Sequence, residues 1–138
     1  MRSLLCSLLL LSANTFAAPE GVPTSDPRWA KAQSSYKAGN KGEGHRLLIA
    51  LADSHPGELG LAVACYSTIL EMEGQPLKSN PWIDLAADRL MALEQFGAIS
   101  ANTEVVHSAV SRVIDKALLE GRHLEARTTS DRFLRKNP

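Results

Sequence analysis

The chain has 138 residues and carries 15 basic and 15 acidic side chains, so its formal net charge at pH 7 is zero. A chain of this length holds one domain with a modest core. The balanced charge argues against a general nucleic-acid or membrane-surface binder, because both activities depend on an excess of basic side chains.

The first 17 residues resemble a secretory signal peptide. Arg2 supplies a positive start, Leu8–Leu11 form most of a short apolar core, and Thr15 and Ala17 are the small residues that a signal peptidase reads. We therefore place the cleavage after Ala17. The alternative is an uncleaved membrane anchor, but the apolar run is shorter than the roughly 18–20 residues that a bilayer requires. The sequence thus predicts an exported protein, periplasmic or secreted, whose mature chain does not insert into a membrane.

The mature chain is expected to start with a flexible leader and a helical hairpin. Residues 18–25 are polar and contain prolines, which is typical of a mobile lead-in. Asp26 is the predicted N-cap of the first helix, with Pro27 at its first position. Gly39 ends this helix and begins the turn to a second helix over residues 42–54.

The third predicted helix, residues 59–72, is the most apolar segment of the mature chain. A helix that is apolar over most of its circumference is expected to be buried by neighbours on more than one side, so we place it at the centre of the fold. Cys65 lies within it and would be the only cysteine left after cleavage. We expect a buried structural thiol with no disulfide.

Three further helices follow after a break at residues 74–76. Asn80 is the predicted N-cap of the fourth, which ends near Gly97, and Asn102 is the predicted N-cap of the fifth, which ends near Gly121. The sixth covers about residues 123–135, and its apolar members are Leu124, Ala126, Phe133 and Leu134. No segment alternates with a period of two for long enough to indicate a strand. The predicted fold class is all-α.

The spacing of turn and stop residues resembles that of tetratricopeptide repeats, which are helix–turn–helix units of about 34 residues. Gly39 and Pro56 are as far apart as Gly121 and Pro138. The residues that carry the resemblance are Trp29, Tyr36, Gly39 and Pro56 in the first unit and Gly121, Ala126 and Pro138 in the last. The resemblance implies that residues 26–138 form a right-handed stack of about three antiparallel helix hairpins, a TPR-like α-solenoid.

The sequence departs from the family pattern in several places. Gly44 stands where the inner helix of a repeat has alanine, and the middle unit contains a long connection over residues 74–81. An unrelated helical bundle remains the alternative fold. The charge is also uneven: residues 50–104 hold eight acids and two bases, and residues 105–138 hold seven bases and four acids. We interpret this as ordinary solvated helix faces, with packing of the basic end on the acidic middle as the alternative.

The sequence contains no pattern that indicates catalysis, a metal site or a cofactor site. The four histidines are His45, His55, His107 and His123, and none has metal-ligand spacing to another histidine or to cysteine. There is neither a nucleophile elbow nor a phosphate-binding glycine loop. We therefore expect no enzymatic activity, no metal and no cofactor.

Tetratricopeptide repeats bind a peptide or partner helix in a concave groove formed by the first helix of each hairpin. The resemblance implies the groove residues Ser34, Lys37, Thr68, Glu71, Ser111 and Asp115. The sub-family that holds a peptide's C-terminal carboxylate needs several basic and amide groups there. Only Lys37 is basic, and Glu71 and Asp115 would repel a carboxylate. We expect no such clamp.

Three hypotheses about function follow from the sequence. The first is a non-catalytic protein–protein interaction or scaffolding module in the cell envelope or secreted space, with a protein or peptide partner and no nucleic acid. The second is a helical accessory region of a larger envelope enzyme or assembly protein whose remainder lies beyond Pro138. The third is a small helical enzyme that uses His107 or His123.

Overall fold

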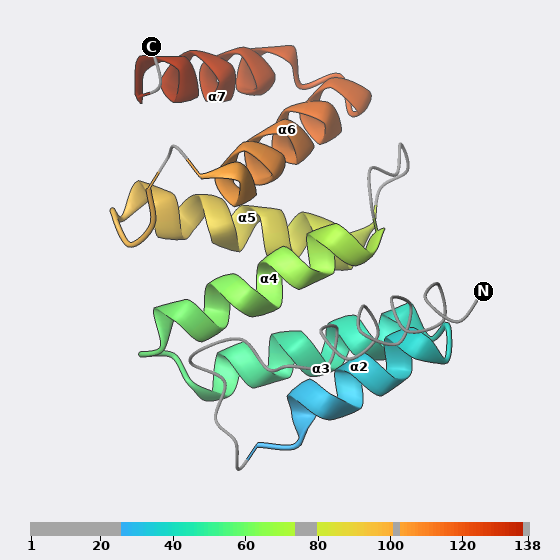
Figure 1. Cartoon of the computed structure of the whole chain (residues 1–138). Coiled ribbons are helices and arrows are strands. Elements are labelled where there is room, and N and C mark those ends of the chain that lie inside the picture. Colours follow the sequence, from blue (N-terminus) through green and yellow to red (C-terminus); the bar gives the residue numbers. More distant parts are fainter. Residues whose placement is uncertain (1–25, 74–79, 101–102, 137–138) are drawn as a thin grey trace, which may run out of the picture. The chain divides into compact units, whose positions relative to one another are not determined.

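The protein is described by a computed structural model that covers residues 26–73, 80–100 and 103–136 (Figure 1). In these ranges the chain forms six α-helices and no strand, which confirms the all-α prediction. Their bounds are α2 Arg28–Lys37, α3 Lys41–Ser54, α4 Leu59–Glu73, α5 Pro81–Gln95, α6 Glu104–Leu119 and α7 His123–Lys136. The predicted signal peptide, the leader and the break at residues 74–76 lie outside the described residues.

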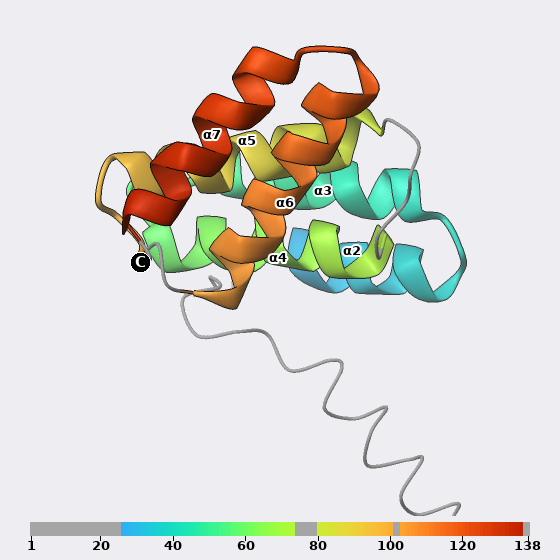
Figure 2. The ribbon, with the colours of Figure 1, turned by 90° about the horizontal axis from the view of Figure 1, so that it is seen from above.

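The chain divides into two compact units, Met1–Leu61 and Ala62–Pro138. In the first, α2 packs against α3 as a hairpin. In the second, α6 packs against both α5 and α7, and Figure 2 shows α6 and α7 joined by a short turn. Each helix of these pairs therefore buries its apolar side against a sequence neighbour, which is compatible with a helical repeat fold.

Three glycines end helices in the same way. Gly39, Gly97 and Gly121 have φ angles of +80°, +75° and +72°, which L side chains rarely adopt. After α2, the Gly39 N–H donates to the carbonyl of Tyr36, and the Asn40 N–H donates to the carbonyl of Ser35. This paired hydrogen bonding is the Schellman motif, and it repeats at the other two glycines. The predicted glycine ends of the helices are confirmed.

The helix starts agree with the sequence at α5 and differ from it at α6. The Asn80 side chain accepts a hydrogen bond from the Trp82 N–H at 3.0 Å, and Pro81 is the first residue of α5. The predicted N-cap Asn102 is wrong by one position. Thr103 caps α6 by accepting from the Val106 N–H at 3.4 Å, because its hydroxyl stands three residues ahead of that donor.

A polar network closes the open end of the first hairpin. The α2 helix starts at Arg28, one residue later than expected, yet the Asp26 carboxylate still accepts from the Arg28 N–H at 3.0 Å. The Arg28 guanidinium donates to the Ala50 carbonyl at 2.9 Å and to the Ser54 hydroxyl at 2.6 Å. The hydrogen bonds from Arg28 hold the pKa of Asp26 well below its usual range. The start of α2 is thereby fixed to the end of α3.

The core of the first hairpin explains why glycine replaces alanine at position 44. The ring of Tyr36 lies against the backbone of Gly44, and an added Cβ there would be 2.5 Å from the ring atom Cε1. The Tyr36 hydroxyl also makes a 2.8 Å hydrogen bond with Nδ1 of His45, whose side chain is buried. The aromatic ring thus occupies the space that a methyl group would need.

The α4 helix is buried along one face and more exposed along the other. Leu61, Cys65 and Ile69 are fully buried, whereas Glu71 is exposed and Leu70 is half-buried. The prediction of a buried thiol is confirmed. The buried face is the one that carries Ile69, and the adjacent Leu70 lies at its edge.

The α5 helix contains two buried acids, each paired with two bases. The carboxylate of Asp84 lies 3.3 Å from Arg112 and 3.4 Å from Lys116, both on α6. The interpretation of the uneven charge as solvated faces is therefore wrong at this acid, because burial in the core requires a partner of opposite charge.

The second acid of α5 is paired with the C-terminal helix. The Glu94 side chain is 2% exposed and accepts from Arg132 at 3.1 Å and from Lys136 at 2.6 Å, both on α7. Burial alone would raise the pKa of Glu94, but the hydrogen bonds from Lys136 and Arg132 outweigh it and hold the pKa below its usual value. The alternative interpretation of the uneven charge, in which the basic end packs on the acidic middle, is therefore confirmed at Glu94.

Candidate partner-binding surfaces

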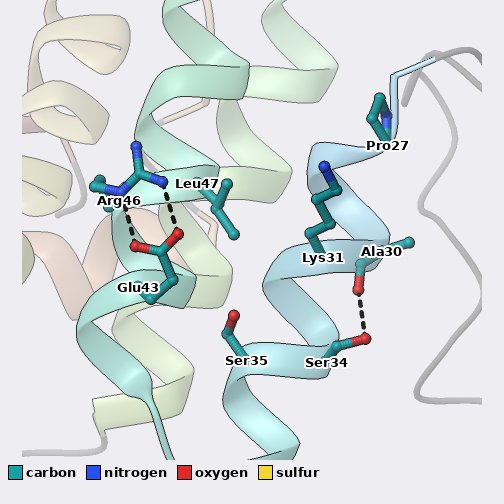
Figure 3. Close-up of a pocket in the computed structure, with 8 residues that line it drawn as sticks. All are labelled: Pro27, Ala30, Lys31, Ser34, Ser35, Glu43, Arg46 and Leu47. Carbon is teal, nitrogen blue, oxygen red and sulfur yellow. Dashed lines mark hydrogen bonds and ion pairs between the residues drawn. The ribbon is translucent and has the colours of Figure 1, made fainter.

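The first hairpin carries an open groove between α2 and α3 with a volume of about 520 Å³. Figure 3 shows Leu47 of α3 pointing toward α2. The other lining residues are Pro27, Ala30, Lys31, Ser34, Ser35, Glu43 and Arg46. An apolar floor with a polar rim is typical of a surface that takes a peptide or a side chain of a partner.

The polar groups of this groove are largely engaged with the hairpin itself. The Arg46 guanidinium donates to both carboxylate oxygens of Glu43, at 2.8 and 2.6 Å, and the Ser34 hydroxyl donates to the Ala30 carbonyl at 3.1 Å (Figure 3). The ion pair lowers the pKa of Glu43. The groove therefore offers a fixed ion pair at its rim.

The six predicted groove residues lie at mostly exposed positions of their helices. Ser34 and Lys37 are exposed on α2, and Ser111 and Asp115 are exposed one turn apart on α6. On α4, Glu71 is exposed, while Thr68 is half-buried and donates to the carbonyl one turn before it at 2.7 Å. Of the six, Ser34 lines the groove of the first hairpin. Partner contact at these residues stays a prediction.

A second surface consists of leucines that the α6–α7 hairpin leaves uncovered. Leu118 and Leu119 at the end of α6 are 48% and 64% exposed. On α7, Leu124 is 79% exposed and Leu134 is 58% exposed, although both were expected among the apolar members of the helix. Leu124 lies about 160° around α7 from the buried Ala126 and Leu134 about 80°, because 100° separates successive residues of a helix. These four leucines are called the terminal leucine surface below.

Three of the four histidines contact neighbouring side chains. His45 bonds to Tyr36 in the core, and Nε2 of His55 lies 3.4 Å from the Asp26 carboxylate. The ring of His107 meets the ring of Phe133 edge-on, with centroids 5.1 Å apart. Among the described residues, no group of three or more histidine, cysteine or acidic side chains is placed to hold a metal ion.

Sequence reasoning missed the terminal leucine surface and the pairing of the α5 acids. The signal for the first was present at Leu124, which lies about 160° around the helix from Ala126. The pairing of Glu94 with Lys136 joins residues far apart in the chain, and only the folded structure reveals it.

None of the helices in the described part of the chain combines the length and the apolar character that a membrane span requires.

Comparison with known proteins found no matching protein family, no similar curated protein and no similar solved structure.

Proposed function

We propose that this chain is a TPR-like, non-catalytic module that binds a protein or peptide partner in the cell envelope or the secreted space. In this proposal the helical hairpins follow one another in a right-handed stack. The observation that carries it is the exposure of large apolar side chains at the end of α6, where Leu118 and Leu119 are 48% and 64% exposed. Exposed apolar clusters of this kind are typical of interaction sites.

The equal register of two hairpins supports the repeat architecture. Gly39 ends α2 and the buried Gly44 follows five positions later, and Gly121 ends α6 and the buried Ala126 follows at the same distance. In both hairpins a small residue stands where the second helix approaches the first.

Site-specific photo-cross-linking in cells that make the protein tests the binding function. A photoreactive residue replaces Ser34 and, separately, Ser111, both exposed and both predicted to face the groove. Matched control sites are Glu58 and Glu120, which are exposed in or beside turns. We expect one common partner from the two groove sites and none from the controls. Products that appear equally from all four sites, or from none, would contradict the proposal.

Export is tested separately by N-terminal sequencing of the protein recovered from the cell envelope or the medium. The sequence predicts that the mature chain begins at Ala18. Recovery of a chain that still begins at Met1, in the cytoplasm alone, would contradict the proposed location and leave the binding proposal standing.

A further inference from the structure

The outer face of α7 carries a pattern that is symmetric along the helix. Leu124, Arg127, Asp131 and Leu134 are separated by three, four and three positions, which places all four on one helical stripe. All four are exposed in the structure, and Arg127 and Asp131 are 83% and 55% exposed. Within the second unit α7 is the last described helix, and α6 covers its other side (Figure 1).

Both the apolar pair and the charged pair are centred on Thr129. A two-fold axis through that position, perpendicular to α7, would bring Leu124 of one chain opposite Leu134 of a second chain. The same axis would bring Arg127 of each chain opposite Asp131 of the other chain, which gives two equivalent pairs. The stripe is therefore complementary to an inverted copy of itself in both hydrophobicity and charge.

Two of the three other basic side chains of α7 are engaged with an acid on α5, and the third, Arg135, is exposed and donates to the Asp131 carbonyl at 3.3 Å. Arg132 and Lys136 are directed to Glu94 on α5, and the acid Glu125 is paired with Arg122. Arg127 has only a loose contact of 3.8 Å with Asp131 in its own helix. The two charges of the stripe thus remain available for partners on a second chain.

We propose that α7 is a self-association surface, on which two copies of this chain pair through antiparallel α7 helices. Two apolar layers of Leu124 against Leu134 stand at the ends, and two ion pairs of Arg127 with Asp131 stand between them. Burial of the exposed leucines drives the pairing, and the charges select the antiparallel direction.

The geometry predicts a weak dimer. The α7 helix has 14 residues and is therefore about 21 Å long. Two such helices bury less than the roughly 1,200–2,000 Å² of a standard stable interface. We expect a dissociation constant between about 10 µM and 1 mM at neutral pH and low salt.

Sedimentation equilibrium of the purified protein over that concentration range tests the proposal. The variants are Arg127→Asp, Asp131→Arg and the double charge swap, with Lys41→Asp on α3 as a control that makes the same change in charge as Arg127→Asp. Far-UV circular dichroism and the thermal midpoint establish that each variant is folded, which we expect because every substituted side chain is exposed.

Each single variant should weaken self-association at least about tenfold, because it places like charges opposite each other. In an equimolar mixture of the two single variants, the dissociation constant should return to within about threefold of the wild-type value. An acid then faces a base in both ion pairs. The double swap should do the same, and Lys41→Asp should behave as the wild type.

Three results would overturn the proposal. A wild type that stays monomeric to about 1 mM would assign the face of α7 to another occupant, such as a further helix or a different protein. Single variants that associate as the wild type does would place any dimer contact elsewhere. Loss of association in the single variants without recovery in the mixture and the double swap would exclude the antiparallel pairing.

Discussion

Substitution of Gly44 by alanine should destabilise the first hairpin although alanine is the better helix former. Gly44 lies inside α3, where replacing glycine by alanine ordinarily stabilises a protein by about 1 kcal/mol. Here the new methyl group would lie 2.5, 2.7 and 2.8 Å from three atoms of the Tyr36 ring. These distances are far below van der Waals contact, so the ring must move.

The Tyr36 ring has little room to move. Its side chain is buried, and its hydroxyl is held by the 2.8 Å hydrogen bond to His45. Overpacking of this kind costs about 1–3 kcal/mol. The better helix propensity of alanine offsets about 1 kcal/mol of this cost. The expected net loss in free energy of unfolding for Gly44→Ala therefore lies between about 0 and 2 kcal/mol.

Gly42 provides a matched control in the same helix. It is exposed, and a Cβ added there meets nothing within 4 Å. Gly42→Ala should therefore stabilise the protein by about 0.5–1 kcal/mol. The free energy of unfolding of both variants is measured by urea titration with far-UV circular dichroism.

A second background separates the steric effect from other causes. When Tyr36→Leu removes the ring, addition of Gly44→Ala should become stabilising, as at Gly42, because the new methyl group then has space. Equal stabilisation by Gly44→Ala and Gly42→Ala in the wild-type background would refute the proposed contact between ring and backbone.

Two further predictions concern the second unit. Glu94→Gln should lower the free energy of unfolding by about 1.5–3 kcal/mol, because the charged hydrogen bonds to Arg132 and Lys136 are lost and both bases still reach solvent. The folded-state pKa of Glu94 lies below its ordinary value of 4.5, so this stabilisation is present above about pH 4.5 and is lost as the pH falls. Urea titrations from neutral pH to about pH 3 should show that the free energy of unfolding falls less in the variant than in the wild type. An equal fall in both proteins would contradict the pairing. Ile69→Ala should cost about 2–5 kcal/mol, because the side chain is fully buried. Leu70→Ala, at the next and half-buried position, should cost about 1 kcal/mol, and equal losses at the two positions would mean that the buried face of α4 is assigned wrongly.

Local signals in the sequence were sufficient for the presence of the helices and for their glycine ends. Gly39 and Gly121 are recognisable because only a residue without a Cβ adopts their positive φ angles at low cost. Asn80 followed by proline marks a helix start by the same kind of local chemistry. The cap at Thr103 was missed because neighbouring asparagine and threonine are both good N-caps, and the hydrogen-bond register decides between them.

Contacts between distant residues could not be predicted in the same way. Gly44 looked like a defect of the repeat pattern until the structure placed the Tyr36 ring beside it. Glu94 looked like a surface acid because its two bases lie about forty positions further along the chain. The sequence names Leu124 and Leu134 as apolar members of α7 without indicating their face, and the structure leaves both exposed. Residue type indicates burial only when the neighbouring helix is known.

The proposed stack of hairpins is tested most directly by a distance between the first and last described helices. Spin labels at Ser34→Cys on α2 and Thr128→Cys on α7, in a chain with Cys65→Ala that is diluted into an excess of unlabelled chain, allow this distance within one molecule to be measured by pulsed electron resonance. Both labelled positions are exposed, so neither label should disturb packing. A linear succession of hairpins separates these helices by several interhelical spacings of about 8–10 Å each, which predicts a distance of about 30 Å or more. A single narrow distance below about 20 Å would show that the first and last helices are neighbours in a closed bundle, and would contradict the stack.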